Sequence, residues 1–261
     1  MRPMDPWALI TGASTGIGRE LARVFAANGF HLALLARNEA RLKELAAECE
    51  RAHPVQTRVL ARDLARPDAA DEIFDALRDT PVEVLVNNAG FGFYGPFAQS
   101  DLRVQTDLMQ VNIIALVQLT HRFLEPMIAR GHGRVLNVAS VAAFLPGPTV
   151  NVYYASKAFV FSFSYALAEE LEGTGVTVTT LCPGSTRTEF FDRANIHMNR
   201  PWPLMDARKV AEVGYRATMK GKRVAIPGWS NKLICALVKR VPPRLPARMV
   251  KKVHAPGPPR A

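Results

Sequence analysis

The chain has 261 residues, of which 48% are hydrophobic and 21% are charged. This composition is typical of a globular protein and excludes a disordered chain, a collagen-like repeat and a coiled coil. The three cysteines, Cys49, Cys182 and Cys235, lie too far apart in the sequence to suggest a zinc site or a disulfide scaffold. We therefore expect no metal and a reducing, cytoplasmic location.

The positive charge is concentrated at the C-terminal end. The net charge is +10, and residues 213–261 hold 12 Lys and Arg but no Asp or Glu. Residues 1–212 are therefore close to neutral. A basic extension on a neutral body argues against a protein that binds nucleic acid.

Neither a secretory leader nor a membrane-spanning helix is expected. The N-terminal apolar run, residues 7–10, is too short for a leader. The uncharged segment 135–156 is interrupted by Pro146, Gly147, Pro148 and Asn151, which do not suit a helix in lipid.

Short β-type runs alternate with longer amphipathic stretches. The expected strands are residues 7–11, 31–36, 55–61, 82–87, 134–139, 176–181 and 223–226. The expected helices are residues 17–28, 39–51, 67–78, 101–129, 151–172 and 206–219. This rhythm predicts a doubly wound α/β fold, in which helices cover both faces of a parallel seven-stranded sheet. We expect one domain, residues 1–228, and a basic, proline-rich extension, residues 229–261.

A glycine-rich turn, TGASTGIG at 11–18, follows the first expected strand. Gly12, Gly16 and Gly18 permit a tight turn, a close approach of the backbone to a diphosphate, and close packing of helix on strand. The helix that opens at Ile17 points its free N–H groups at the anion. Because a strand precedes the turn and a helix follows it, we favour a dinucleotide site over a plain connection.

The end of the second expected strand indicates which nucleotide binds. An NAD site usually has an acidic residue there, whereas this strand ends at Arg37 and no acid occurs before Glu39. A guanidinium binds a 2′-phosphate that a carboxylate would repel. Arg37 therefore favours NADP, and NAD is the alternative.

A tyrosine and a lysine lie on one face of the expected helix 151–172. Tyr153 and Lys157 are four residues apart, and Lys157 is the only charged residue in 135–168. A lone cation in an apolar segment is costly unless a site uses it. Tyr154 also lies within reach, and spacing alone does not choose between the two tyrosines.

Together these motifs resemble the single-domain branch of the short-chain dehydrogenase/reductase family, with its TGxxxGxG and YxxxK motifs. The resemblance covers about residues 7–228 and implies a Rossmann-type fold. It rests on TGASTGIG (11–18), Asp63-Leu64, NNAG (87–90), Asn112, Ser140, YYASK (153–157) and Pro183-Gly184 with Thr188.

The resemblance implies the catalytic residues Ser140, Tyr153, Lys157 and Asn112. The family places its serine 13 positions before the tyrosine, which selects Tyr153 over Tyr154. Tyr153 would donate the proton in carbonyl reduction, and a nearby Lys157 ammonium would favour its phenolate. Ser140 would hold the substrate oxygen, although without the tyrosine we would interpret it as a capping hydroxyl. Asn112 would anchor a water.

The resemblance also implies the cofactor contacts, with Asp63 at the adenine and the 183–188 loop at the carboxamide. Several NADP-dependent members carry a basic residue where this chain has Thr15, which leaves Arg37 as the main phosphate ligand. The implied contacts are Gly12, Ser14, Thr15, Gly16, Ile17, Gly18, Arg37, Asp63, Leu64, Asn88, Ala89, Gly90, Tyr153, Lys157, Pro183, Gly184, Thr186 and Thr188.

Aromatic residues surround the expected carbonyl site, and a lipophilic substrate would suit such a lining. The same side chains would equally close the core under a lid. We expect the substrate loop at about residues 185–207. Another alternative is a substrate with an acidic group, which Arg187, Arg193 and Arg200 would bind. The candidate substrate residues are Phe91, Phe93, Tyr94, Phe144, Phe190, Phe191 and Trp202.

We expect an NADP(H)-dependent oxidoreductase that interconverts a carbonyl and a secondary alcohol by hydride transfer, with Tyr153 as acid and base. The alternative is a non-catalytic, nucleotide-sensing protein on the same fold, which would not need a proton donor. The resemblance implies a homo-oligomer, dimer or tetramer, assembled through residues 101–129 and 151–172. A basic amphipathic helix at 231–241 would pack locally, contact a neighbouring subunit, cover the site or make weak peripheral contact with a membrane.

Overall fold

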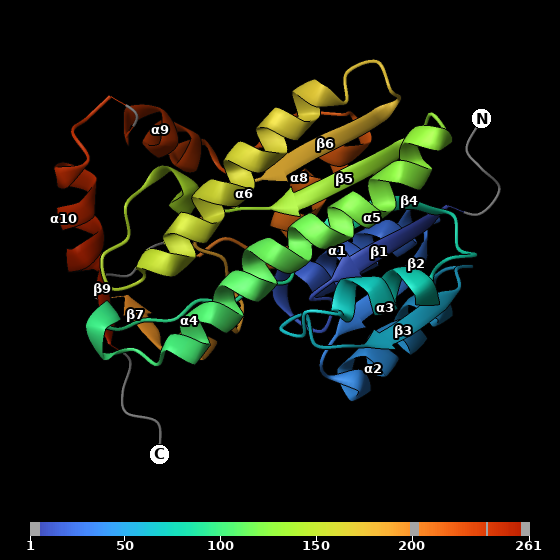
Figure 1. Ribbon diagram of the computed structural model, residues 1–261, viewed down its shortest axis with the longest axis horizontal. Helices are drawn as coiled ribbons and strands as arrows, with labels where there is room; N and C mark the ends of the chain where they lie inside the picture. Colours follow the sequence, from blue (N-terminus) through green and yellow to red (C-terminus); the bar gives the residue numbers. More distant parts are fainter. Residues whose placement is uncertain (1–5, 199–203, 239, 257–261) are drawn as a thin grey trace.

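A computed structural model gives the structure of the chain and describes residues 6–198, 204–238 and 240–256. Its centre is a parallel seven-stranded sheet in the order β3-β2-β1-β4-β5-β6-β8 (Figure 1). The doubly wound fold expected from the sequence is confirmed. The strands are β1 (Trp7–Thr11), β2 (His31–Ala36), β3 (Thr57–Ala61), β4 (Val82–Asn87), β5 (Gly133–Val138), β6 (Val176–Leu181) and β8 (Val224–Ala225).

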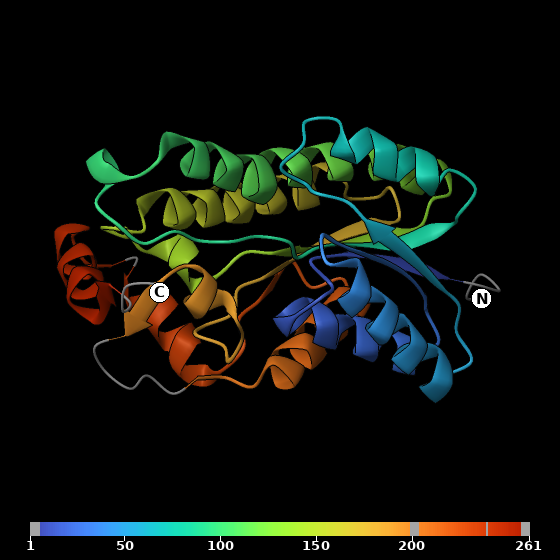
Figure 2. The ribbon, with the colours of Figure 1, turned by 90° about the horizontal axis from the view of Figure 1, so that it is seen from below.

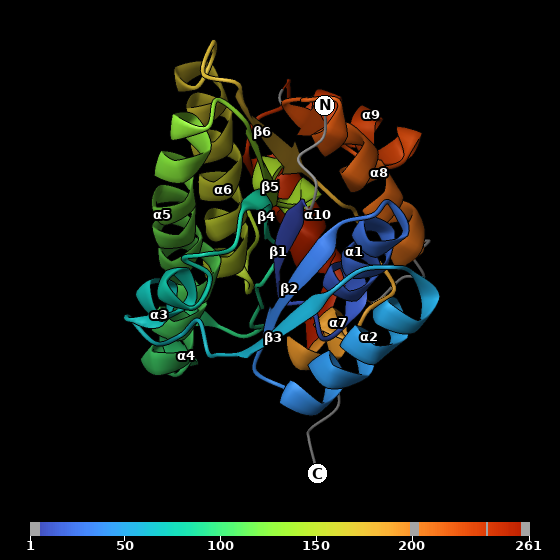
Figure 3. The same ribbon diagram turned by 90° about the vertical axis from the view of Figure 1, so that its right-hand side faces the viewer.

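Helices cover both faces of the sheet (Figure 3). One layer holds α1 (Gly16–Ala27), α2 (Glu39–Ala52) and α8 (Ala207–Met219), and the other holds α3 (Ala69–Ala76), α4 (Leu102–Met109), α5 (Ala115–Ala129) and α6 (Asn151–Glu170). Successive strand residues enter opposite cores: Ile10 and Leu34 pack under α1 and α8, whereas Leu9 and Leu35 pack under α3 and α5. The strands are therefore apolar throughout, as parallel strands buried on both sides must be.

The helix expected at 101–129 differs in detail. It divides into α4, a π-helical turn at Gln110–Ile114 and α5. Such a turn inserts an extra residue and commonly marks a functional position. Here it contains the buried Asn112.

The chain leaves β1 and β4 in opposite directions across the sheet, because β2 and β3 lie on one side of β1 and β5, β6 and β8 lie beyond β4. Ligands of open parallel sheets bind beyond the carboxyl ends of the strands at such a reversal. The fold therefore brings the glycine turn after β1 close to the chain that follows β4 and β5.

The C-terminal extension has structure of its own at the carboxyl-end edge of the sheet (Figure 2). The helix expected at 231–241 is α9 (Trp229–Val238), and an unexpected α10 (Arg244–Val253) follows it. The last strand, β9 (His254–Pro256), pairs antiparallel with β7 (Ile196–Met198), which follows the short α7 (Phe190–Arg193). Within the described ranges, no helix is long and apolar enough to cross a membrane.

Candidate active site

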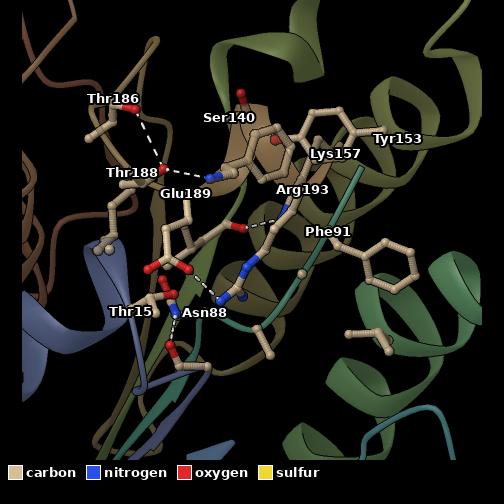
Figure 4. A pocket seen from close by; sticks show the side chains of 18 of the residues that line it. Thr15, Asn88, Phe91, Ser140, Tyr153, Lys157, Thr186, Thr188, Glu189 and Arg193 are labelled. Carbon is tan, nitrogen blue, oxygen red and sulfur yellow. Dashed lines mark hydrogen bonds and ion pairs between the residues drawn. The ribbon is translucent and has the colours of Figure 1, made fainter. Parts of the chain in front are cut away.

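A cleft of about 990 Å³ lies at the carboxyl ends of β1, β2, β4, β5 and β6. Of the expected cofactor contacts, only Gly18 does not line it. Ser140 lines it as well, whereas Asn112 is buried behind it. Figure 4 shows Thr15 and Asn88 at one end of the cleft and Ser140, Tyr153 and Lys157 at the other.

The glycines of the turn have no room for side chains. Gly12 and Gly16 adopt positive φ angles of 67° and 56°, which favour glycine. A Cβ at Gly18 would lie 2.3 Å from the Gly12 carbonyl oxygen, so helix α1 packs directly on the turn. These are the two demands of a diphosphate-binding turn, a bent backbone and a close helix.

The N-terminus of α1 also fits an anion. Its N-cap, Thr15, makes no side-chain capping hydrogen bond, whereas Asn38, Asp101 and Asp206 cap α2, α4 and α8 with their side chains. The first N–H groups of α1 are therefore available to phosphate oxygens, and the helix dipole favours negative charge there.

Two charged side chains mark the end of the cleft where the adenine ribose would bind. Arg37 is 72% exposed, and its Nη1 lies 4.0 Å from Asp63 Oδ2. Asp63 also accepts a hydrogen bond from Ala65 N at 3.0 Å, which holds its carboxylate near the cleft. Arg62, which the sequence analysis did not single out, lines the same end and pairs with Glu72 at 3.0 Å.

Thr11 holds the segment after β4 against the glycine turn. Its Oγ1 accepts hydrogen bonds from Asn88 N and Ala89 N, both at 2.9 Å. The Asn88 side-chain amide donates to the Thr11 carbonyl oxygen at 2.9 Å. These bonds fix the NNAG segment at the floor of the cleft.

Ser140 lies two residues after β5 and has the capping role considered from the sequence. Its Oγ accepts a hydrogen bond from Ala142 N at 3.1 Å, so it caps the following turn. Ser140 also lies near enough to Tyr153 to oppose the rise of its pKa. It has no such effect on Tyr154, which packs its ring against Gly147, where a Cβ would lie 2.3 Å from that ring.

Lys157 is 5% exposed, and its Nζ donates to the Val138 carbonyl oxygen at 2.9 Å. Nζ lies 5.8 Å from the centroid of the Tyr153 ring. Burial lowers the pKa of Lys157 to about 8 and raises that of Tyr153 to about 12, with the nearby Ser140 hydroxyl opposing the latter shift. The phenolate-favouring effect of Lys157 that we expected is not among the causes that set the Tyr153 pKa, and the Tyr153 phenol is protonated at pH 7.

Both polar atoms of the Asn112 side chain form hydrogen bonds near the site. Its Oδ1 accepts from Phe91 N, and its Nδ2 donates to the Phe91 carbonyl oxygen, both at 3.1 Å. Nδ2 also donates to Ser156 Oγ at 3.0 Å, and Ser156 in turn donates to the Tyr153 carbonyl oxygen at 2.7 Å. Ser156 was not predicted. It links the π-helical turn to the helix that carries Tyr153.

The expected substrate residues divide between two places. Phe91, Phe190 and Phe191 line the cleft, and the Phe190 ring lies 5.0 Å from that of Tyr153. Phe93 and Tyr94 do not line it. Phe144 packs on Phe161 at 4.7 Å and lines a separate cavity of about 270 Å³. Trp202 and Arg200 lie outside the described residues.

An ion-pair cluster at the cleft escaped the sequence analysis. The Glu189 carboxylate accepts from Arg41 Nη1 at 2.9 and 3.0 Å. It also accepts from Arg193 Nη2 at 2.6 Å (Figure 4). Arg41 and Glu189 are 148 positions apart, so no local pattern signals their contact. The cluster joins α2 to α7, and it neutralises an arginine that we had considered for an acidic substrate. Among the described residues, no cluster of three His, Cys, Asp or Glu side chains could hold a metal ion.

Comparison with known proteins identifies the family. The family model for short chain dehydrogenases matches residues 6–199. The chain belongs to the short-chain dehydrogenase family. Members of this family are oxidoreductases, so the chain is an oxidoreductase that acts on a carbonyl or alcohol group. A dinucleotide in the cleft is consistent with this membership.

Three relatives illustrate the range within the family. Sulfoacetaldehyde reductase 2 of Chromohalobacter salexigens is 43% identical over 228 residues, 83% of this chain and 90% of the relative. Very-long-chain 3-oxoacyl-CoA reductase of Laccaria bicolor is 39% identical over 179 residues, 67% of this chain but only 53% of that longer protein. A short-chain dehydrogenase from Sphingobium yanoikuyae, solved in complex with NADPH, superposes with a TM-score of 0.81 at 32% identity and covers 90% of this chain and 93% of its own.

Proposed function

We propose that this protein is an NADPH-dependent reductase that interconverts a lipophilic carbonyl compound and a secondary alcohol. The observation that carries the proposal is the placement of the Tyr153 phenol near Ser140 and a buried Lys157, in a cleft whose other end fits a dinucleotide. The solved relative with bound NADPH supports the choice of cofactor.

The nicotinamide, when bound, would supply the hydride. Ser140 would hold the carbonyl oxygen of the substrate, and the neutral Tyr153 phenol would donate its proton to that oxygen as negative charge develops on it. With a pKa of about 8, Lys157 is mostly protonated at pH 7 and favours the phenolate left after transfer. Asn112 and Ser156 would keep the helix of Tyr153 in register with Phe91.

The lining beside Tyr153 supports a lipophilic substrate. It is formed largely by apolar and aromatic side chains: Phe91, Leu145, Val150, Tyr154, Phe190, Phe191 and Ile196. Asp192 and Arg193 are the charged residues of α7 that line the cleft, and Arg193 already pairs with Glu189. A sulfonated substrate would need a cation that is not neutralised by the protein, and among the described residues only Lys157 offers one at this end of the cleft. We therefore place this chain nearer the long-chain reductase than the sulfoacetaldehyde reductase in substrate class.

Turnover of NADPH tests this function. Purified protein is expected to oxidise NADPH in the presence of bulky or long-chain ketones, with a higher kcat/KM than for sulfoacetaldehyde. A higher kcat/KM for sulfoacetaldehyde would overturn the substrate class. Tight NADPH binding without turnover on a broad panel of ketones and aldehydes would favour a nucleotide-sensing protein.

Arg37→Ala is expected to weaken NADPH binding by roughly tenfold and to leave NADH binding nearly unchanged. A charge-assisted phosphate contact contributes about 1.5 to 3 kcal/mol, and the exposure of Arg37 places its effect at the lower end. Isothermal titration of both cofactors measures the two losses. Arg66→Ala is the matched control, because Arg66 is also exposed but pairs with Asp68 and Glu72 outside the cleft. Equal losses of affinity for NADPH and NADH would contradict the assignment of Arg37 as the ligand of the 2′-phosphate.

We also propose a dimer or tetramer assembled through α4, α5 and α6. These helices and the π-helical turn between α4 and α5 expose large apolar side chains that a solvated surface would not favour: Leu102, Met109, Ile114, Ile128, Phe159 and Tyr165. Light scattering checks the proposal, since a monomer mass at micromolar concentration would contradict it.

A further inference from the structure

The C-terminal helices α9 and α10 lie at the same end of the molecule (Figure 1) and expose side chains that the proposed chemistry does not use. Both lie at the end of the molecule where the strands of the sheet end (Figures 1 and 2). We define the C-terminal face as the exposed residues of 229–252. None of these residues lines the active-site cleft.

Each helix has a buried side that anchors it and an exposed side that is apolar. Asn231 and Cys235 are buried under α9, and Pro246 and Val250 are buried under α10. On the exposed side, Trp229 is 79% exposed and Met249 is 67% exposed. Leu233, Leu237 and Leu245 are also exposed, and the spacing of four residues places those of α9 on one face. These five side chains contribute little to the core, so their apolar character needs another explanation.

The C-terminal face is also strongly basic. Its exposed cations are Lys232, Arg240, Arg244, Arg248, Lys251 and Lys252. The chain contains no Asp or Glu after Glu212, so the segment itself supplies no carboxylate to balance them. On α10, Arg244 and Arg248 lie one turn apart, as do Leu245 and Met249, so a basic stripe runs beside an apolar one.

We propose that the C-terminal face docks on an anionic lipid bilayer, with its apolar side chains at the acyl boundary and its Lys and Arg on the headgroups. Amphipathic helices with large apolar and basic faces bind such interfaces, and the attraction is both hydrophobic and electrostatic. A second copy of this chain suits the face less well, because a symmetric contact would bring two sets of cations together. Neither helix is long enough to cross a bilayer, so the contact is peripheral.

The C-terminal face is joined to the segment that covers the cleft. Strand β9 directly follows α10 and pairs with β7, in register Ile196↔Pro256 and Met198↔His254. Ile196 lines the cleft beside Tyr153. Docking would therefore hold the substrate end of the cleft close to the bilayer surface. In that position the cleft would receive lipophilic substrates from the lipid. This consequence rests on the proposed function, whereas the docking itself is independent of it.

Vesicle co-sedimentation of the full chain tests the docking directly. The probes are vesicles of phosphatidylcholine alone and of phosphatidylcholine mixed with phosphatidylserine, each at low and high salt. The variants are Arg244→Glu/Arg248→Glu for charge and Trp229→Ser/Leu233→Ser for the apolar side. Lys220→Glu/Lys222→Glu is the matched control, because it changes the net charge equally at two exposed lysines before the amino end of β8, whereas α9 follows the carboxyl end of that strand.

Wild-type protein and the lysine control are expected to sediment with phosphatidylserine vesicles and to be released by high salt. Both C-terminal variants should lose about tenfold or more of their partition coefficient while keeping the wild-type melting temperature and NADPH affinity. Failure of wild-type protein to bind, or equal loss in the lysine control, would overturn the proposal. A concentration-dependent molar mass that falls in Trp229→Ser/Leu233→Ser would assign the face to a second copy instead. The readout needs no turnover, so it is independent of whether the proposed reaction is correct.

Discussion

Tyr153→Phe is expected to lower kcat by about 100-fold to 10,000-fold, which is the contribution of a positioned general acid. The change removes only the hydroxyl, whose pKa of about 12 keeps it protonated and able to donate at neutral pH. The ring remains to pack against Phe190 at 5.0 Å. Cofactor affinity should change little, so the loss should appear in kcat and in kcat/KM rather than in the dissociation constant for NADPH.

Tyr154→Phe is the matched control, because it removes the same group from the adjacent residue. Tyr154 also lines the cleft, but Ser140 affects the pKa of Tyr153 and not that of Tyr154. We expect a change in kcat of severalfold at most. Steady-state kinetics with NADPH and a responsive ketone measure both variants, and a larger loss in Tyr154→Phe would reverse the assignment of the proton donor.

The sequence predicted the strands better than the surroundings of the site. Buried parallel strands are apolar throughout, and β1, β2, β4 and β6 coincide with the predicted ranges. The π-helical turn around Asn112 was not predicted, because the apolar period of residues 101–129 is compatible with one continuous helix. The strand β9 was missed for a different reason: residues 254–256 acquire a strand conformation only by pairing with β7.

Motif order located the ends of the cleft, whereas contacts between distant residues escaped prediction. The turn after β1 and the Tyr153–Lys157 pair are local patterns, so spacing reveals them. Glu189 and Arg41 meet only in the fold, and Phe144 follows β5 closely yet packs against Phe161, away from the cleft. Which way an aromatic side chain points after a strand depends on the turn that follows, here the 3-10 turn Val141–Phe144. Composition alone does not specify that turn.

Lys157→Met is expected to abolish efficient turnover and at the same time to stabilise the nucleotide-free protein at pH 7. Burial lowers the pKa of Lys157 from 10.5 to about 8, which corresponds to roughly 3 kcal/mol of unfavourable free energy for the charged form in the folded chain. Methionine fills a similar volume without the charge. Because the bond to the Val138 carbonyl oxygen is also lost, we expect a net gain of about 1 to 2 kcal/mol in the free energy of unfolding.

The lowered pKa of Lys157 also predicts how the stability difference between wild type and Lys157→Met changes with pH. The folded-state pKa of Lys157 lies below the unfolded value, so between about pH 8 and pH 10.5 the unfolded chain binds more protons at this group than the folded chain. The wild-type protein therefore gains stability relative to Lys157→Met as the pH rises through that window, and the advantage of the variant shrinks. The buried tyrosines are common to both proteins and cancel in the difference. Denaturant unfolding at pH 7 and pH 9.5 measures the effect, with the exposed Lys43→Met as the control for loss of a lysine. A variant less stable than wild type at pH 7 would mean that the Lys157 ammonium stabilises the fold rather than being held there for the reaction.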